Sequence, residues 1–440
     1  MRPRFSTPLL TVLKNRSFRL LWYNGAISNT GELSELLVMG WLVLQLTGSP
    51  WQVALVGLSR TVSLFAFSLI AGAIGDQRDR RHIILASNAT NIMVAAAVLL
   101  VLTLGDVQPW HLFLAAAVRG ATRSFENTSR RALVFHIVGP ASLIQAISLE
   151  HIGMSTGRIL GPIAIGTLLQ VTGTAVSSYS LLTGLYSIAF ISVVLLKVAP
   201  TLSSLPRRPV LRSVGEGLKY AYSTPSIAGV LTASVVMNAM FQYHLFIPVV
   251  AQEHLGVGPG LMGLLAAADG MGFVFGALFI GLLGSKIRFH GRVFLAGCIG
   301  VTVFLLAFAL SPWYILSFFL LVSLGTFQVG FSTMQSSILL MASPPNFHSR
   351  IFGAQGLAVG TGQFGNMEMG ALASAFSITV ALAANALVGM GLLLLIAIFM
   401  PALRRPIERV EEPIEDTPQP LVEGQEMTTE EPRPKPEGPV

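Results

Sequence analysis

The sequence predicts an all-α membrane protein with twelve transmembrane helices in two pseudo-symmetric six-helix bundles. Of its 440 residues 52% are hydrophobic and only 11% are charged, with a mean hydropathy of +0.68. A soluble domain carries about 25% charged residues. Long apolar stretches run from Phe18 to Met400, and the polar loops between them alternate between basic loops and loops without Lys or Arg. Because basic loops stay in the cytoplasm, we expect both termini there.

The individual helices follow from the roughly 20 apolar residues that a helix needs to cross a bilayer. The basic loops follow every second helix. The predicted spans are 18–46, 51–75, 83–104, 110–134, 143–171, 175–199, 226–253, 259–284, 292–311, 313–341, 351–373 and 376–400.

Composition also divides the chain. Residues 1–199 form the expected N-terminal bundle and 226–400 the C-terminal bundle. The proline-containing, basic segment 200–225 is expected to be a cytoplasmic central loop. The acidic, proline-rich segment 401–440 cannot bury enough apolar area to offset its ordering entropy, so it is expected to be a disordered cytoplasmic tail.

A weak internal repeat relates the two halves. Pro50 and Gly72 bound the second predicted helix, and Pro259 and Gly281 bound the eighth with the same separation, since 72 − 50 and 281 − 259 both equal 22. Duplicated six-helix halves are a common plan of secondary transporters.

Several other classes of protein do not fit. The net charge of +7 comes from loops that face anionic lipid headgroups, so we expect no nucleic-acid partner. Cys298 is alone, which excludes an intrachain disulfide and a zinc site built from thiols. The glycines of 360–365 spell a dinucleotide fingerprint inside an apolar span, where that motif does not function. Without a phosphate loop or a nucleophile–base constellation, we expect neither an enzyme nor a cofactor or metal.

The loop after the second predicted helix carries the strongest local motif. Residues 72–81 read GAIGDQRDRR, with Gly72, Asp76, Arg80 and Arg81 at its characteristic positions. This stretch resembles the signature of the major facilitator superfamily, although that pattern usually has a basic residue at position 77 and glycine at 79. The resemblance implies a cytoplasmic gate in which Asp76 pairs with arginines. The alternative is a basic loop that only sets topology.

A second stretch narrows the resemblance. Residues 41–50, WLVLQLTGSP, are similar to the end of the first helix in a bacterial branch that includes enterobactin-type siderophore exporters and macrolide efflux proteins. The likeness covers roughly the first 200 residues well and the rest by architecture. It implies the major facilitator fold, the bacterial inner membrane, export of a small molecule and a monomer.

The fifth predicted helix carries a glycine motif. Residues 157–166, GRILGPIAIG, resemble the antiporter motif of exporting members, with isoleucine in place of one glycine. Gly157 and Gly161 share a face that lets another helix approach closely, and Pro162 can bend the helix. Gly166 ends the motif. The alternative is ordinary glycine-mediated packing.

Ionisable residues in apolar helices are candidates for function because each is costly in hydrocarbon. The first helix carries Glu32 and Glu35, and the fourth carries Arg119, Arg123 and Glu126. The resemblance implies that these helices line the central cavity. We expect Glu32 to accept protons, with Glu35 as the alternate, and Arg123 or Arg119 to tune that group or hold an anionic substrate. The alternative is a static ion-pair network.

Two ion pairs are expected from the depths of their residues. Glu35 and Arg60 lie at similar depth, as do Arg158 in helix five and Asp269 in helix eight. The resemblance places helices five and eight in contact between the halves, so the second pair is expected to form or break as the halves rock.

Polar side chains of the second half complete the expected cargo site. They are Asn238, Gln242, Tyr243 and His244 in helix seven, and Gln328, Gln335, Gln355 and Gln363 in helices ten and eleven. His244 is interpreted as a packing residue rather than a proton relay.

Together these features predict a secondary active transporter that exports a small amphipathic or anionic compound in exchange for protons by alternating access. A lipid or lysolipid translocator on the same fold, distinguished by lateral openings between helices, is one alternative. A non-transporting membrane sensor or scaffold is another.

Overall fold

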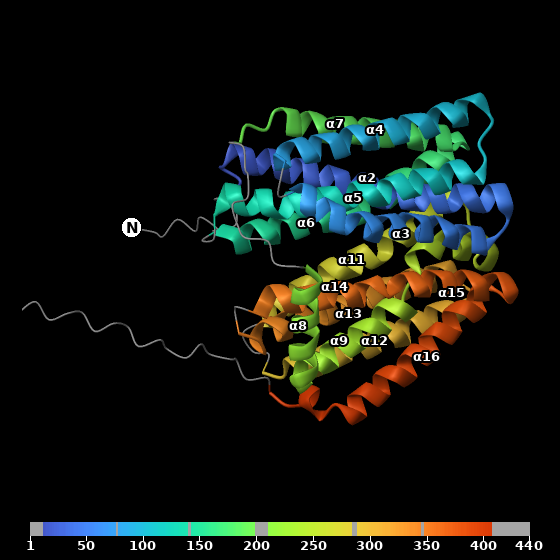
Figure 1. Cartoon of the computed structure of the whole chain (residues 1–440). Coiled ribbons are helices and arrows are strands. Elements are labelled where there is room, and N and C mark those ends of the chain that lie inside the picture. Colours follow the sequence, from blue (N-terminus) through green and yellow to red (C-terminus); the bar gives the residue numbers. More distant parts are fainter. Residues whose placement is uncertain are drawn as a thin grey trace, which may run out of the picture.

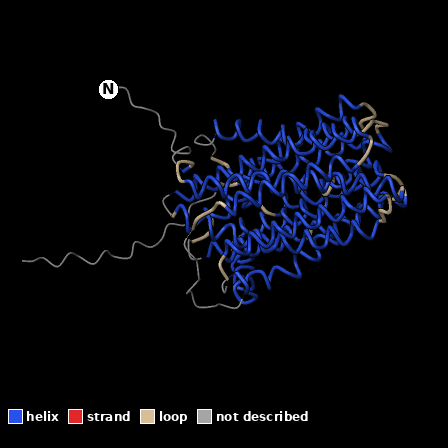
Figure 2. Tube along the Cα trace, turned by 90° about the horizontal axis from the view of Figure 1, so that it is seen from above, coloured by secondary structure: helices blue, strands red, loops and turns tan. Residues whose placement is uncertain are grey.

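The computed structural model describes residues 12–75, 78–139, 142–198, 210–283, 288–344 and 347–406, and their regular structure is entirely helical. The tube of Figure 2 shows helices running the length of the molecule, with loops gathered at its two ends. The predicted all-α class and two-bundle plan are confirmed. Eight of the described helices are long and apolar enough to cross a membrane.

The first half forms the upper bundle in Figure 1. Its helices are α2 (Arg16–Thr47), α3 (Pro50–Gly75), α4 (Arg80–Leu104), α5 (Pro109–Val138), α6 (Leu143–Thr172) and α7 (Ala175–Val194). Each agrees with a predicted span to within a few residues. The α2 helix begins two residues earlier than expected, because the Asn15 side chain accepts hydrogen bonds from the first backbone amides and caps it.

The second half forms the lower bundle of Figure 1 and is less regular. Its elements are α9 (Pro225–Met240), η2 (His244–Phe246), α10 (Ile247–Val249), η3 (Val250–His254), α11 (Pro259–Leu283), α12 (His290–Leu310), α13 (Tyr314–Met341), α14 (His348–Gly360), α15 (Gly362–Ala375), α16 (Ile378–Phe399) and η6 (Pro401–Arg404).

Two predicted spans, 226–253 and 351–373, are broken in the structure. The first breaks at 241–243, where helical hydrogen bonding is interrupted before Pro248, a residue that lacks a backbone donor and crowds the preceding turn. The second breaks at Thr361, between two glycines, the residue type least suited to a helix interior after proline.

The segment expected to be a central loop contains a helix. Residues Val210–Ser223 form α8, which runs across one end of the lower bundle (Figure 1). Apolar residues recur along it at helical spacing, and Ala221 is fully buried. The expectation of a loop was wrong for residues 210–223, because apolar residues recur at helical spacing once the prolines at 206 and 209 are passed.

The basic residues of both halves lie at the same end of the molecule. The start of α2, the end of α16 and α8 lie at one end of the molecule (Figure 1), which also holds Arg81, Arg131 and Arg292 and is called the basic end below. The loops at the opposite end, the neutral end, contain no Lys or Arg among residues 48–49, 105–108, 173–174, 255–258, 311–313 and 376–377.

The two halves contact each other chiefly through α6 with α11 and α3 with α15. Near the neutral end, a Cβ atom on Gly166 would lie 2.6 Å from the Cα atom of Gly263. The backbone amide of Trp51 donates a hydrogen bond of 2.8 Å to the Ser374 hydroxyl. In this conformation the halves are therefore closed against each other at the neutral end.

Close glycine contacts hold the first half together and give a testable prediction. A Cβ atom on Gly120 of α5 would lie only 1.7 Å from the backbone oxygen of Arg60 in α3. Gly120→Ala is expected to destabilise the protein by about 2 kcal/mol, since overpacking costs 1–3 kcal/mol. The measurement is thermal unfolding in detergent. Gly184→Ala, where nothing lies within 4 Å, is the matched control and should unfold no earlier than the wild type.

Candidate functional site

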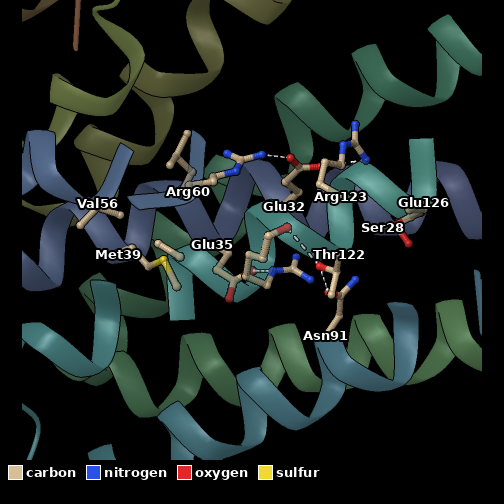
Figure 3. A pocket seen from close by; sticks show the side chains of 13 residues that line it. Ser28, Glu32, Glu35, Met39, Val56, Arg60, Asn91, Thr122, Arg123 and Glu126 are labelled. Carbon is tan, nitrogen blue, oxygen red and sulfur yellow. Dashed lines mark hydrogen bonds and ion pairs between the residues drawn. The ribbon is translucent and has the colours of Figure 1, made fainter. Parts of the chain in front are cut away.

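A polar pocket lies within the first half, between α2, α3, α4 and α5 (Figure 3). Its volume is about 20 Å³, which is room for water but far below the 300–1,000 Å³ of a typical ligand site. All five ionisable residues predicted on helices one and four line this pocket. A sixth, Arg60 of α3, lines it as well, although it was predicted only as an ion-pair partner. These residues are Glu32, Glu35, Arg60, Arg119, Arg123 and Glu126.

Glu32 joins three helices. One carboxylate oxygen contacts the Arg60 guanidinium of α3, and the other lies 2.9 Å from Nη1 of Arg123 in α5. Figure 3 shows both arginines directed at this carboxylate. Nη2 of Arg123 also donates to the Asn29 side-chain oxygen at 2.9 Å. Arg60 therefore pairs with Glu32 rather than with Glu35, the partner expected from depth, because three residues of α2 separate the two carboxylates by nearly one turn.

Glu35 has a different and more deeply buried set of partners. Its Oε2 atom lies 2.6 Å from Nε of Arg119 and accepts a hydrogen bond of 2.7 Å from the Tyr186 hydroxyl of α7. The Arg119 guanidinium also lies over the Tyr186 ring, 4.2 Å from its centroid. The other carboxylate oxygen of Glu35 is buried without a hydrogen-bond partner. Glu35 is thus held on one oxygen only.

Glu126 extends the network toward the basic end. It pairs with Arg130 one turn along α5 at 2.8 Å, and Arg130 also donates to the backbone oxygen of Leu21 at 2.9 Å and contacts the side chain of Asn24. Four arginines therefore contact three carboxylates in this cluster, with Glu32 shared between two of them. One positive charge has no carboxylate of its own.

A second cluster lies at the contact between the halves. Arg158 of α6 contacts the Asp269 carboxylate of α11, and its Nη2 atom also donates to the Gln328 oxygen at 3.1 Å. The Tyr243 hydroxyl donates to the same carboxylate oxygen at 3.1 Å, and Nε2 of His244 reaches it as well. The structure thus brings together the two residues predicted as an inter-half pair. His244, interpreted from sequence as a packing residue, belongs to the cluster.

His244 contacts two groups with opposite requirements. Its Nε2 atom lies 2.8 Å from Nη2 of Arg158, which can only donate, and also faces the Asp269 carboxylate oxygen, which can only accept. A ring nitrogen cannot accept from the arginine and donate to the carboxylate at once. The tautomer of His244 therefore decides which of these two groups it bonds to, whereas Arg158 contacts Asp269 directly in either case.

The helix-five motif serves two different contacts. A Cβ atom on Gly157 would lie 2.5 Å from the Thr30 hydroxyl, and one on Gly161 would lie 2.4 Å from the Ser34 hydroxyl, so both positions pack α6 against α2. Gly166 instead packs against α11 of the other half. The α6 helix continues without interruption through Pro162.

Polar residues predicted to line the cargo site from the second half do not line the pocket in Figure 3. The amide of Gln242, in the break after α9, donates to the backbone oxygen of Asn238 at 2.7 Å, and Gln242 faces Gly362 of α15. Asn238 donates to the backbone oxygen of Ser234 within α9 at 2.8 Å. Gln363 lies in α15, but its side chain is outside the described ones.

The predicted gate is described only in part. Asp76 is outside the described residues, and Gly72 lies in α3 without a described environment. Arg80 begins α4, and Arg81 donates to the backbone oxygens of Val193 and Val194, at 3.3 and 2.9 Å, at the end of α7. A cation at the carbonyls of the last turn is favourable in the field of the helix.

Tyr186 is the site residue that the sequence analysis did not name, and Arg60 was named only as a partner of Glu35. Arg60 is an arginine inside an apolar span, the same signal that singled out the other charged residues of the pocket. Tyr186 gave no such signal, because the ring is common in membrane helices and only packing brings its hydroxyl to a buried carboxylate.

Comparison with known proteins gives a family and relatives that agree with each other. Residues 7–431 match a family described as transmembrane secretion effectors. The multidrug efflux pump Tap of Mycolicibacterium fortuitum is 24% identical over 90% of this chain and 98% of its own length. The enterobactin exporter EntS of Escherichia coli O1:K1 / APEC is 25% identical over 71% of this chain and 74% of its own.

Solved structures share the fold at low sequence identity. A POT family transporter in complex with 5-aminolevulinic acid superposes with a TM-score of 0.73 at 9% identity, over 89% of this chain and 97% of its own. A bacterial homologue of the human lysosomal transporter Spinster gives 0.64 at 13% identity, over 91% and 96%.

Proposed function

The chain belongs to the transmembrane secretion effector family of the major facilitator superfamily, and on that premise we propose that it exports a small amphipathic or anionic compound in exchange for protons. The observation that carries this proposal is the buried cluster of four arginines on three carboxylates around the pocket. Ionisable groups inside a membrane protein are costly, and such sites commonly lie on substrate or proton routes.

The charge balance supports an anionic cargo. The fourth arginine leaves the cluster one positive charge in excess, which an anionic group of a substrate would neutralise. The related efflux pump and siderophore exporter support the outward direction of transport. The basic end would face the cytoplasm by the placement of its arginines, in the inner membrane of a bacterium.

The proton route would use the same carboxylates. Protonation of Glu32 has to displace Arg60 or Arg123, and protonation of Glu35 has to displace Arg119. Exchange requires that the cluster hold either the proton or the anionic cargo, and not both together. Cargo would leave at the outer side before a proton enters there, and the proton would leave at the cytoplasmic side before the next cargo binds. This alternation would couple the two fluxes in opposite directions.

The test uses the purified protein in liposomes with an imposed pH gradient and a panel of fluorescent anionic, neutral and cationic amphiphiles. We expect the anionic compounds to move against the direction of proton flow, and a protonophore to abolish that movement. Equal transport of neutral and anionic compounds, or no gradient-driven flux of any compound, would contradict the proposal.

Alternating access predicts that locking the neutral end stops transport. A disulfide between Trp51→Cys and Ser374→Cys, placed at the 2.8 Å contact between the halves, should hold the present conformation. Oxidation is expected to reduce cargo flux at least about tenfold, and a reductant should restore it, because the halves must separate there to expose the site on the other side. Each single cysteine variant is the control. Full flux in the oxidised double variant would exclude this movement.

A further inference from the structure

A second cavity lies on the other side of α5 from the charged pocket. Its volume is about 540 Å³, within the range of ligand sites, and its walls come from α3, α4 and α5. The α5 helix packs against both of the others and forms the floor. The lining residues are mostly small or apolar and include Ser63, Phe67, Ala86, Thr90, Ala117 and Ala121.

This cavity opens on the lipid-facing side of the first bundle. Ala86 of α4 is exposed and Phe67 of α3 is 39% exposed in the described structure. Thr90 lies ten residues into α4, about 15 Å from the basic end at the rise of an α-helix. That depth corresponds to the hydrocarbon region of a bilayer whose apolar core is about 30 Å thick. A molecule could therefore reach the cavity from the membrane itself.

Thr122 borders both cavities. It lines the charged pocket and the lateral cavity, and its hydroxyl lies 2.8 Å from the Asn91 side-chain oxygen of α4 and 3.0 Å from the backbone oxygen of Arg119. Asn91 also lines the charged pocket. The apolar space and the arginine cluster therefore meet at this pair of side chains.

From this geometry we propose that the lateral cavity binds the apolar part of an amphipathic anion whose charged group lies at Arg119 and Arg123, with the Asn91–Thr122 pair as the partition between the two. The inference deepens the proposed function and rests on it for the nature of the cargo. The uncompensated positive charge of the cluster selects an anionic group, and the volume and lining of the lateral cavity select an apolar body. The cargo would enter sideways from the lipid.

Binding is tested at equilibrium, without a gradient, in nanodiscs of neutral phospholipid. The probes are anilinonaphthalene sulfonate, an amphipathic anion, and N-phenylnaphthylamine, which has the same rings without the sulfonate. Fluorescence is corrected for empty nanodiscs. Ala86→Phe fills the lateral cavity. Ala97→Phe is its matched control, since Ala97 is also an exposed alanine of α4, lies 97 − 86 = 11 residues or three turns away, and does not line the cavity.

We expect the sulfonate probe to bind the wild type and Ala97→Phe equally and Ala86→Phe at least about tenfold more weakly. Arg123→Gln should weaken the sulfonate probe and leave the neutral probe unchanged. Equal binding to the two alanine variants would overturn the proposal, as would equal effects of Arg123→Gln on both probes. Displacement of the sulfonate probe by anionic phospholipid would assign the cavity to a membrane lipid instead and also overturn it.

These results are separable from those on transport. Probe binding that follows the pattern above in a protein that moves nothing in liposomes would support the binding site and contradict the transport proposal. Proton-driven flux that is unchanged in Ala86→Phe would support the transport proposal and contradict the binding site in the lateral cavity.

Discussion

Asp269→Arg is expected to abolish transport, because it places two guanidinium groups against each other at the buried contact between the halves. Asp269 is 1% exposed, and its partner Arg158 comes from the other half. Breaking a buried ion pair by removing one partner costs about 3–5 kcal/mol, and a like charge adds to that cost. The halves should therefore no longer close as they do here. Flux in liposomes is the measurement.

The reverse substitution provides the control. Arg158→Asp combined with Asp269→Arg restores opposite charges across the same contact, and we expect it to recover part of the lost flux and of the thermal stability. Recovery of stability without flux would show that the pair serves folding only. No recovery of either in a protein that still purifies as a folded monodisperse species would exclude the ion pair as the interaction that matters.

His244→Gln tests the third partner of Asp269. Glutamine can still donate to the carboxylate but loses the ring that stacks on Tyr243 at 4.1 Å. We expect a smaller loss of flux than with Asp269→Arg, because the ion pair between Arg158 and Asp269 remains. A loss of flux as large as that of Asp269→Arg would contradict this ranking.

Glu32→Gln is the second substitution with a large expected effect, and it separates proton coupling from cargo binding. The amide cannot carry a proton between the two sides, so accumulation driven by a pH gradient should fall at least about tenfold. Exchange of labelled for unlabelled cargo needs no net proton movement and should persist. Both assays use the same liposomes.

Glu35→Gln is the comparison for that experiment. Glu35 pairs with one arginine and a tyrosine, whereas Glu32 is shared by two arginines. If Glu32 carries the proton, only its substitution uncouples exchange from the gradient, and Glu35→Gln retains driven accumulation. The opposite pattern would identify Glu35. Driven accumulation in both single variants and in the double variant would remove the two residues from the proton route.

Much of the site could be predicted from the sequence, because the signals that mark its residues lie within single helices. Charged residues in apolar spans are costly wherever they lie, so Glu32, Glu35, Arg119 and Arg123 were singled out by type alone. Helical periodicity and span length then gave their depth. Depth also indicated the pair of Arg158 with Asp269, but it gave Glu35 as the partner of Arg60, which the structure places against Glu32.

The broken seventh span shows the same limit. Pro248 was visible in the sequence, but its effect on residues 241–243, which lets Tyr243 and His244 reach Asp269, depends on where the chain can place the freed backbone groups. Asn238 and Gln242 were expected at the cargo site because they are polar, and that expectation stays a prediction. Each donates to the backbone oxygen four residues earlier, a local contact that polarity alone does not reveal.

By itself, the order of residues determined the twelve-span plan, the polarity of the two ends and the costly charges, because the bilayer acts on each segment separately through its length, apolarity and flanking arginines. The tertiary structure alone decided which arginine meets which carboxylate, that Thr122 stands between two cavities, and that the halves touch at the neutral end. Those facts depend on the rotation of each helix about its axis and on which neighbour it packs against, and both are set by contacts between segments far apart in the chain.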